Sequence, residues 1–268
     1  MKTMILSTRN TLAIADTIEQ ASRRTASAVI TDLKQCILEK GYATWQVSSG
    51  GTPKRVYEII TGEMADQLDW NKVTLVQMDE YAGVKLTDPI SQYAFLDESL
   101  VTRLPFADVL AFDNVAMNNP ALFEQRIKRV AGIDVAIHGI GVNGHLAFNE
   151  PHSNFNSRTR IVELADSTRL ANSRFFYSTD LVPTHGITVG LGTAMEAAKI
   201  YLLAFGREKR KAVFNAIVGR CRVANPASIL QAHGNAVYML DREAASDTWV
   251  APLRNQPERT AARLPYVA

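Results

Sequence analysis

Short apolar segments alternate with segments of helical periodicity along most of the chain, and this alternation constrains the fold more than any other feature. Elements that alternate in this way pack as a mostly parallel β-sheet with helices on both faces. Strands are expected at residues 43–48, 73–78, 109–112, 133–137, 187–189, 200–204 and 236–240. Helices are expected at 10–39 (one helix or two joined, ending at Gly41), 54–64, 87–104, 120–131, 192–198, 209–219 and 226–230. The sequence therefore predicts an α/β fold with a Rossmann-like open sheet.

Length and composition narrow the class further. The 268 residues fit one domain, 1–268, with a tail at 242–268 in which scattered charges and prolines indicate no role. The net charge of +2, with both signs mixed throughout, predicts neither a nucleic-acid-binding stripe nor a membrane-binding patch. Cys36 and Cys221 lack metal-ligand spacing, so free thiols and a cytoplasmic location are expected. There is no signal-peptide core and no apolar run long enough to span a bilayer.

A glycine-containing loop joins the strand at 43–48 to the helix at 54–64. It consists of Ser49, Gly50, Gly51 and Thr52. Thr52 is expected to be the N-cap of the helix, with Pro53 in the first helical position. Exposed N–H groups and the helix dipole suit a phosphate, although an ordinary strand-to-helix turn is favoured on this segment alone. The loop has neither a Walker A ending nor the spacing of a dinucleotide-binding fingerprint.

The strand at 73–78 ends in an acidic pair, Asp79 and Glu80, followed by Tyr81. Open α/β sheets bind ligands at the carboxyl ends of their strands, which is where this pair is expected. Adjacent side chains of an extended segment point in opposite directions, so the two carboxylates cannot share one role. A solvated acidic turn is the alternative interpretation.

The strand at 133–137 leads into a glycine-rich loop that carries an amide, an imidazole and a carboxylate. These are the side chains of Asn143, His145 and Glu150. The combination suits proton transfer, whereas packing glycines and a structural histidine are the alternative. The polar and basic segment that follows, near 152–185, is interpreted as a lid, with a plain surface connection as its alternative.

The strings MDEY (78–81), GIGVNGHLAFNEP (139–151), SRTR (157–160) and ANSRFF (171–176) occur in this order. With them, the chain from about Ser48 to about Asp241 resembles the glucosamine-6-phosphate deaminase (isomerase) family, within the glucosamine-6-phosphate isomerase/6-phosphogluconolactonase superfamily. The resemblance implies an enzyme of amino sugar catabolism that converts glucosamine 6-phosphate and water to fructose 6-phosphate and ammonium, without metal or organic cofactor.

The resemblance also implies roles for individual residues. Asp79 is the expected base at C2 and C1 of the sugar, and His145 is expected to open the ring with help from Glu150. Asn143 stands where many members have aspartate, and because it cannot carry charge its share is hydrogen bonding. The expected phosphate ligands are the loop 49–52, Arg174 in ANSRFF and Lys209 after the strand at 200–204; arginine pairs with phosphate in bidentate fashion.

Three other functions compete with this one. A 6-phosphogluconolactonase is expected to have Asp-Glu-Arg where this chain has Asp79-Glu80-Tyr81. A galactosamine-6-phosphate deaminase uses nearly the same catalytic set, so it stays open. A sugar-phosphate sensor of a transcription regulator is disfavoured, because a helix-turn-helix segment is absent and Asp79, His145 and Glu150 are all present.

The resemblance leaves the oligomeric state open, since members occur as monomers and as hexamers. In the hexamers, N-acetylglucosamine 6-phosphate binds an allosteric site at subunit contacts. Of the residues linked to that site, Ser153 and Arg160 are kept, but Val162 and Glu163 replace a Lys-Thr pair. Weak or no activation by this effector is therefore expected.

Overall fold

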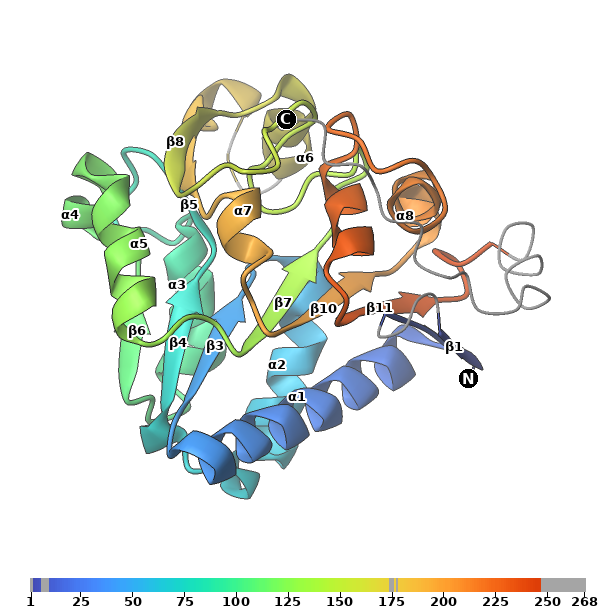
Figure 1. The fold of residues 1–268 in the computed structure, drawn as a ribbon. Helices are drawn as coiled ribbons and strands as arrows, with labels where there is room; N and C mark the ends of the chain where they lie inside the picture. The colour runs from blue at the N-terminus through green and yellow to red at the C-terminus, as the bar shows by residue number, and fades with distance from the viewer. Residues whose placement is uncertain (1, 6–9, 174–175, 177, 247–268) are drawn as a thin grey trace.

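The structure is a computed structural model that describes residues 2–5, 10–173, 176 and 178–246. Its centre is a twisted sheet of eight strands among the described residues, in the order β1-β2-β11-β10-β7-β3-β4-β6 (Figure 1). All neighbouring pairs are parallel except β1 and β2. The predicted α/β class with a mostly parallel open sheet is confirmed.

The strands of this sheet are β1 (Lys2–Ile5), β2 (Thr11–Ala15), β3 (Ala43–Val47), β4 (Val73–Gln77), β6 (Asp108–Leu110), β7 (Val135–Gly139), β10 (Lys199–Ala204) and β11 (Ala236–Asp241). The α-helices are α1 (Ile18–Lys40), α2 (Gly51–Glu63), α3 (Gln92–Leu96), α4 (Asn114–Asn118), α5 (Pro120–Arg129), α6 (Asp166–Asn172), α7 (Leu191–Ala194) and α8 (Arg210–Ile217). A π-helix (Asp97–Val101) and several 3₁₀ turns, among them η6 (Arg207–Lys209) and η7 (Pro226–Ala232), complete the chain.

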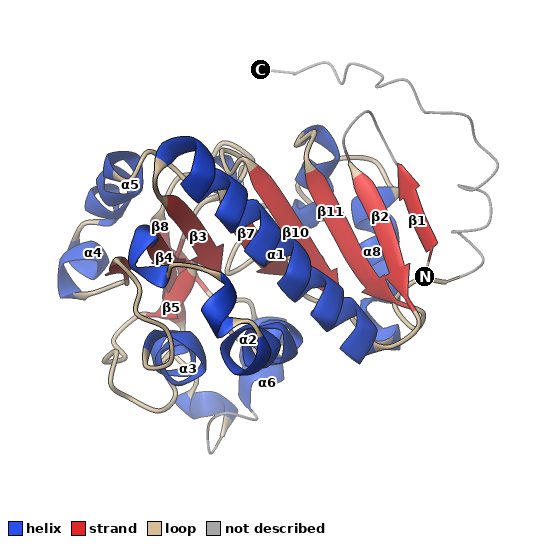
Figure 2. Ribbon diagram, turned by 90° about the horizontal axis from the view of Figure 1, so that it is seen from below, coloured by secondary structure: helices blue, strands red, loops and turns tan. Residues whose placement is uncertain are grey.

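Helices cover both faces of the sheet. α1 crosses one face diagonally beside α2 (Figure 2), and their apolar residues form one buried cluster with that face. α5, α8 and η7 form a second cluster with the other face. β10 shows why both faces can be apolar: Tyr201 and Leu203 belong to the first cluster and Leu202 and Ala204 to the second. Alternation along fully buried strands therefore produces two cores.

A second, antiparallel sheet lies at the carboxyl edge of the first. It consists of β5 (Asp79–Tyr81), β9 (His185–Thr188) and β8 (Arg160–Glu163), in that order (Figure 1). The segment predicted as a lid, 152–185, contributes β8 and α6 to this region. Its movement stays a prediction, and Arg174 lies outside the described residues.

The expected helix over 10–39 was wrong at its start. β2 pairs in parallel with β11, and Leu12 and Ala15 are fully buried. Their apolar spacing fits both a helix and a strand buried on two faces, so periodicity did not separate them. The helix starts later because the Thr17 hydroxyl accepts a hydrogen bond from Gln20 N, as an N-cap does. Gly41 ends α1 with φ 87°, as predicted.

Other elements also differ from the expectation. The helix expected over 87–104 begins only at Gln92, because the Ser91 hydroxyl caps its first N–H groups. The central strand continues two residues beyond 137, to Gly139, and the helix α4 was not predicted. Thr52 is not the N-cap of α2; that position belongs to Gly50, whose φ of 100° and ψ of −177° suit only glycine.

Candidate active site

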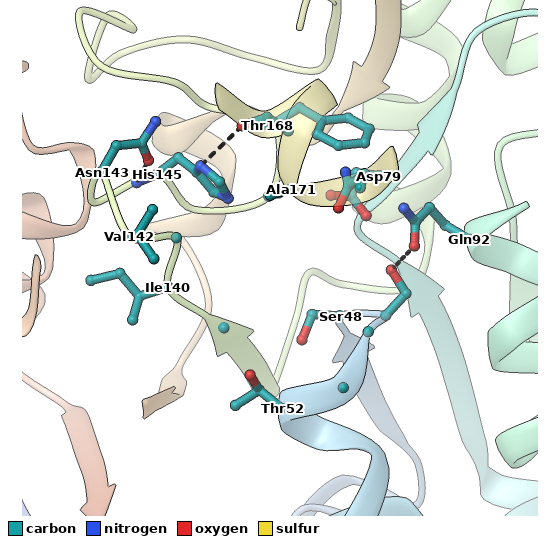
Figure 3. A pocket seen from close by; sticks show the side chains of 18 of the residues that line it. Ser48, Thr52, Asp79, Gln92, Ile140, Val142, Asn143, His145, Thr168 and Ala171 are labelled. Carbon is teal, nitrogen blue, oxygen red and sulfur yellow. Dashed lines mark hydrogen bonds between the residues drawn. The ribbon is translucent and has the colours of Figure 1, made fainter. Parts of the chain in front are cut away.

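One pocket at the carboxyl edge of the main sheet brings together most of the predicted site residues (Figure 3). It lies between the loops that follow β3 and β7, the strand β5, helix α6 and the turn η6. The predicted residues that line it are Ser49, Gly50, Gly51, Thr52, Asp79, Asn143, His145 and Lys209. Figure 3 shows His145 on one side of this pocket and Asp79 on the other.

Asp79 is a buried carboxyl group, not part of a solvated turn. Its exposed fraction is 8%, and it begins β5, separated from the end of β4 at Gln77 by Met78 alone. Burial, reinforced by the neighbouring Glu80, raises the pKa of Asp79 to about 7. A carboxyl with such a pKa can both accept and return a proton near neutral pH. The neighbouring Glu80 points away from the pocket, as the alternation of a strand requires.

His145 and Glu150 form an imidazole–carboxylate pair. Nδ1 of His145 lies 3.4 Å from Oε2 of Glu150 and 3.5 Å from the hydroxyl of Thr168. Burial acts to raise the pKa of Glu150, but hydrogen bonds and charge from His145, with hydrogen bonds from Thr168 and Asn143, outweigh it and lower this pKa. Glu150 therefore presents an ionised carboxylate to Nδ1, which fixes the imidazole orientation.

Asn143 connects the two members of this pair. Its Nδ2 donates to Oε2 of Glu150 at 2.8 Å, and its Oδ1 accepts from the backbone N–H of His145 at 3.1 Å. Both contacts are hydrogen bonds of a neutral amide, as expected for asparagine at this position. Asn143 thus orients the carboxylate that orients the histidine.

The glycines of this loop have separate steric reasons. The Cβ of any residue at position 141 would lie 2.3 Å from the His145 ring. Gly144 has φ 88° and closes the turn by donating to the carbonyl of Gly141 at 3.0 Å. A side chain at 141 would displace the imidazole, so this glycine is tied to the site and not only to packing.

The loop before α2 has the geometry of an anion site. Because Gly50 is the N-cap, Gly51 and Thr52 occupy the first turn, and their N–H groups have no carbonyl partner within the helix. The dipole of this 13-residue helix adds positive potential at the same point. Lys209, at the end of η6, lines the same pocket and would add a positive charge.

Several pocket residues were not predicted. They are Ser48, Gln92, Ile140, Val142, Ser167, Thr168, Ala171 and Asn172, among others. Gln92 accepts a hydrogen bond from the Ser49 hydroxyl. Thr168 donates to Glu150, and with Asn172 it has the i,i+4 spacing of one helix face. That spacing was visible in the sequence, but the contact of α6 with the pocket was not.

Arg158, in the string SRTR, has a structural role. Its guanidinium pairs with Glu124 at 2.6 Å and with Glu196 at 2.5 Å, which joins the segment after the glycine loop to α5 and to the turn that follows α7. Arg160 donates instead to Oδ1 of Asn149 at 2.9 Å and to the Ser153 hydroxyl at 3.3 Å. Neither arginine lines the pocket.

Among the described residues, no group of three or more His, Cys, Asp or Glu side chains is arranged to hold a metal ion. Within the same residues, no helix has the length and apolar character needed to cross a membrane.

Comparison with known proteins places this chain in a family. The family model described as glucosamine-6-phosphate isomerases/6-phosphogluconolactonase matches residues 16–239. The chain belongs to this family. Within it, a glucosamine-6-phosphate deaminase of Halalkalibacterium halodurans is 39% identical over 207 residues, covering 75% of this chain and 84% of the relative. A glucosamine-6-phosphate deaminase of Bacillus cytotoxicus is 37% identical over 235 residues, covering 85% and 87%.

Solved structures of the family share the fold. A monomeric glucosamine-6-phosphate deaminase has a TM-score of 0.80 and 32% identity, covering 87% of this chain and 98% of its own. A 6-phosphogluconolactonase from Trypanosoma cruzi has a TM-score of 0.72 at 16% identity, covering 91% and 98%. At such low identity the second likeness shows the fold alone.

Proposed function

We propose that this protein is a glucosamine-6-phosphate deaminase, which converts glucosamine 6-phosphate and water to fructose 6-phosphate and ammonium. The observation that carries the proposal is Asp79, a buried carboxyl with a pKa raised to about 7 by burial and by Glu80, in one pocket with His145. An aldose–ketose conversion requires such a group. Relatives with this name align over most of the chain.

The phosphate would bind at the N-terminus of α2. There the N–H groups of Gly51 and Thr52 and the Ser49 hydroxyl surround one end of the pocket, and Lys209 supplies positive charge. Charge-assisted hydrogen bonds to phosphate are about twice as strong as neutral ones, so this end would anchor the substrate. Arg174 is proposed as a further cation on the sequence resemblance.

Ring opening would be the task of His145. Glu150 engages Nδ1 at 3.4 Å, so a neutral imidazole carries its proton on Nδ1 and offers Nε2 as a base. Nε2 takes the proton of the anomeric hydroxyl and delivers it to the ring oxygen, which leaves an open-chain aldehyde. The negative charge of Glu150 stabilises the transient imidazolium.

Proton transfer between carbons would be the task of Asp79. Its carboxylate removes the C2 proton while the substrate's own C2 ammonium group gives a proton to the aldehyde oxygen, which leaves a neutral enolamine. The same carboxyl returns its proton to C1, which gives a protonated ketimine. Water then adds to C2 and ammonia leaves, so fructose 6-phosphate and ammonium are released. One acid/base group is sufficient because Asp79 is deprotonated and reprotonated within the cycle.

The proposal is tested by a coupled assay for fructose 6-phosphate and ammonium. Glucosamine 6-phosphate, galactosamine 6-phosphate and 6-phosphogluconolactone are supplied in parallel at equal concentration. We expect equimolar product and ammonium from glucosamine 6-phosphate at the highest kcat/KM of the three. Faster ammonium release from galactosamine 6-phosphate would reassign the substrate. Hydrolysis of the lactone, monitored by acid release, with no ammonium from either amino sugar would reject the function.

A further inference from the structure

Glu80 is a fully buried carboxylate that the mechanism above does not use. Its exposed fraction is 0%. Its two oxygens accept five hydrogen bonds: from Gln77 Nε2 at 3.0 Å, the N–H of Tyr81 at 2.8 Å, the Ser91 hydroxyl at 2.7 Å, and the N–H groups of Gln92 at 3.0 Å and Tyr93 at 2.9 Å. All five partners are donors, an arrangement that suits an ionised carboxylate, which only accepts hydrogen bonds. None of the five donors is a cation, so the charge of Glu80 is stabilised by neutral hydrogen-bond donors of the protein.

Three of these donors belong to the start of helix α3. Ser91 is its N-cap, and Gln92 and Tyr93 are its first two residues. The backbone of Gln92 is therefore held on Glu80, while its side chain turns into the pocket and accepts from the Ser49 hydroxyl (Figure 3). Ser49 precedes the N-terminus of α2, where the phosphate would bind. Glu80 thus connects β5, α3 and the loop before α2.

We propose that Glu80 is a positioning residue for this site, which holds Gln92 against Ser49 at the substrate and places a fixed negative charge beside Asp79. The proposal rests on the proposed function for its kinetic consequences. Gln92 is then a substrate-contacting residue, because its side chain lines the pocket between the phosphate-binding loop and Asp79.

The charges around Asp79 agree with this assignment. Burial raises the pKa of Asp79 first, and Glu80 is the charged group that raises it further. Other ionisable side chains nearby are His145 and Lys209 on the pocket wall, His185 on β9, Arg160 and Glu163 on β8, and Tyr93 and Asp97 along α3 and the helical turn that follows. None of these side chains contributes to the raised pKa of Asp79. Removal of the charge at position 80 should therefore make Asp79 more acidic.

Four variants separate the two parts of the role. Glu80→Gln removes the charge and disturbs the acceptor set, whereas Glu80→Asp keeps the charge but shortens the side chain by one methylene. Gln92→Leu removes only the pocket contact. Glu163→Gln, an exposed carboxylate on the same antiparallel sheet, is the matched control.

The measurement is kcat/KM for glucosamine 6-phosphate against pH, with KM recorded separately. For Glu80→Gln we expect the acidic limb of the kcat/KM profile, where activity falls as the pH is lowered, to move to lower pH by roughly 1 unit. We also expect KM to rise. For Glu80→Asp and Gln92→Leu we expect an unmoved limb and a KM raised roughly threefold to tenfold, the cost of one or two hydrogen bonds. Ionisation of the substrate is common to all the proteins and cancels in the comparison. The control should match the wild type.

A folded Glu80→Gln protein with an unmoved acidic limb, or with wild-type KM, overturns the proposal. If Glu80→Gln does not fold, Glu80→Asp decides: a raised KM supports the role and a wild-type KM rejects it. A carboxyl ¹³C NMR titration of Asp79, assigned with Asp79→Asn, gives a readout independent of activity. Absence of deaminase activity in the wild type would reject the proposed function, while the titration would still test the effect of Glu80 on Asp79.

Discussion

Asp79 combines reactivity with a cost to stability, because the same burial produces both. A carboxyl in water is ionised well below neutral pH, whereas the pKa of Asp79 is raised to about 7, by burial and then by Glu80. Near neutral pH the group is present in both forms, which suits a base that must also act as an acid. Ionising Asp79 in the folded protein therefore costs free energy, and this cost makes the free energy of unfolding depend on pH.

The first prediction follows from this linkage. A carboxyl whose pKa is raised in the folded state stabilises the fold below its unfolded pKa, near 3.8, and loses that stabilisation as pH rises through about 7. Asp79→Asn has no such loss. Urea unfolding should therefore show the variant gaining stability relative to the wild type between pH 4 and pH 8. The gain should be a few kcal/mol. A difference that is constant across this range would contradict the assigned environment of Asp79.

The second prediction concerns His145, which we expect to be needed for ring opening more than for isomerisation. His145→Gln keeps a polar side chain but cannot transfer a proton, so turnover of the cyclic substrate should fall about 10²–10⁴-fold. A 5-deoxy analogue of glucosamine 6-phosphate cannot close the six-membered ring, so the His145→Gln change should lower its turnover much less. Equal losses on the two substrates would count against this role.

The acid/base side chains of the pocket could be singled out from the sequence, whereas the residues that contact and position them could not. Asp79, His145 and Glu150 could be singled out because the strings around them resemble a known family, whereas the residues alone left a solvated turn and a structural histidine open. Gln92 and Thr168 were not found, because a glutamine or threonine in a polar segment carries no signal until tertiary contacts place it. Glu80 was seen as one of a pair pointing in opposite directions, but the five donors around it come from residues up to 13 positions away.

The elements that build the site differ in how well local sequence specifies them. β3, β4 and β10 were predicted nearly within their bounds, because short apolar runs bounded by turn residues mark buried strands. For α1 only the C-terminal end was predicted correctly. β2 was misassigned because its four apolar residues, 12–15, fit either a helix or a strand, and only pairing with β11 decides. The start of α3 depends on Ser91 and Glu80, which a local pattern cannot reveal. Element boundaries thus failed where a tertiary contact sets them.

The third prediction concerns the turn η6 and its cation. Lys209→Ala should raise KM for glucosamine 6-phosphate by more than tenfold, because a charge-assisted hydrogen bond contributes roughly 1.5–3 kcal/mol. Lys211→Ala, an exposed neighbour outside the pocket, is the control and should leave KM unchanged. If Lys209→Ala distinguished glucosamine 6-phosphate from unphosphorylated glucosamine as well as the wild type does, phosphate binding by Lys209 would be refuted.

The candidate active site lies where the two sheets meet. The parallel sheet supplies the loops after β3 and β7, and the small antiparallel sheet supplies Asp79. Ligand binding at the carboxyl ends of the strands is the general behaviour of open α/β sheets. The sequence predicted that edge, but not the antiparallel sheet, because β5 and β8 have only three and four residues.

The fourth prediction is that N-acetylglucosamine 6-phosphate does not strongly activate the protein. An effector must bind one global state better than another, and its phosphate needs cations. Arg160 is bound to Asn149 and Ser153, whereas Val162 on the same strand offers no charge and Glu163 is exposed and acidic. Velocity against glucosamine 6-phosphate should be hyperbolic and barely changed by the effector. A sigmoidal curve made hyperbolic by the effector would show that this interpretation is wrong.

The most direct test of the account is the behaviour of Asp79→Asn with glucosamine 6-phosphate. Asparagine keeps the shape of the side chain but cannot accept the C2 proton. We expect a dissociation constant for the substrate close to that of the wild type, and a kcat for release of fructose 6-phosphate and ammonium that is lower by about 10²–10⁴-fold. Near-wild-type kcat in a folded Asp79→Asn protein would contradict the assignment of this pocket as the site of deamination.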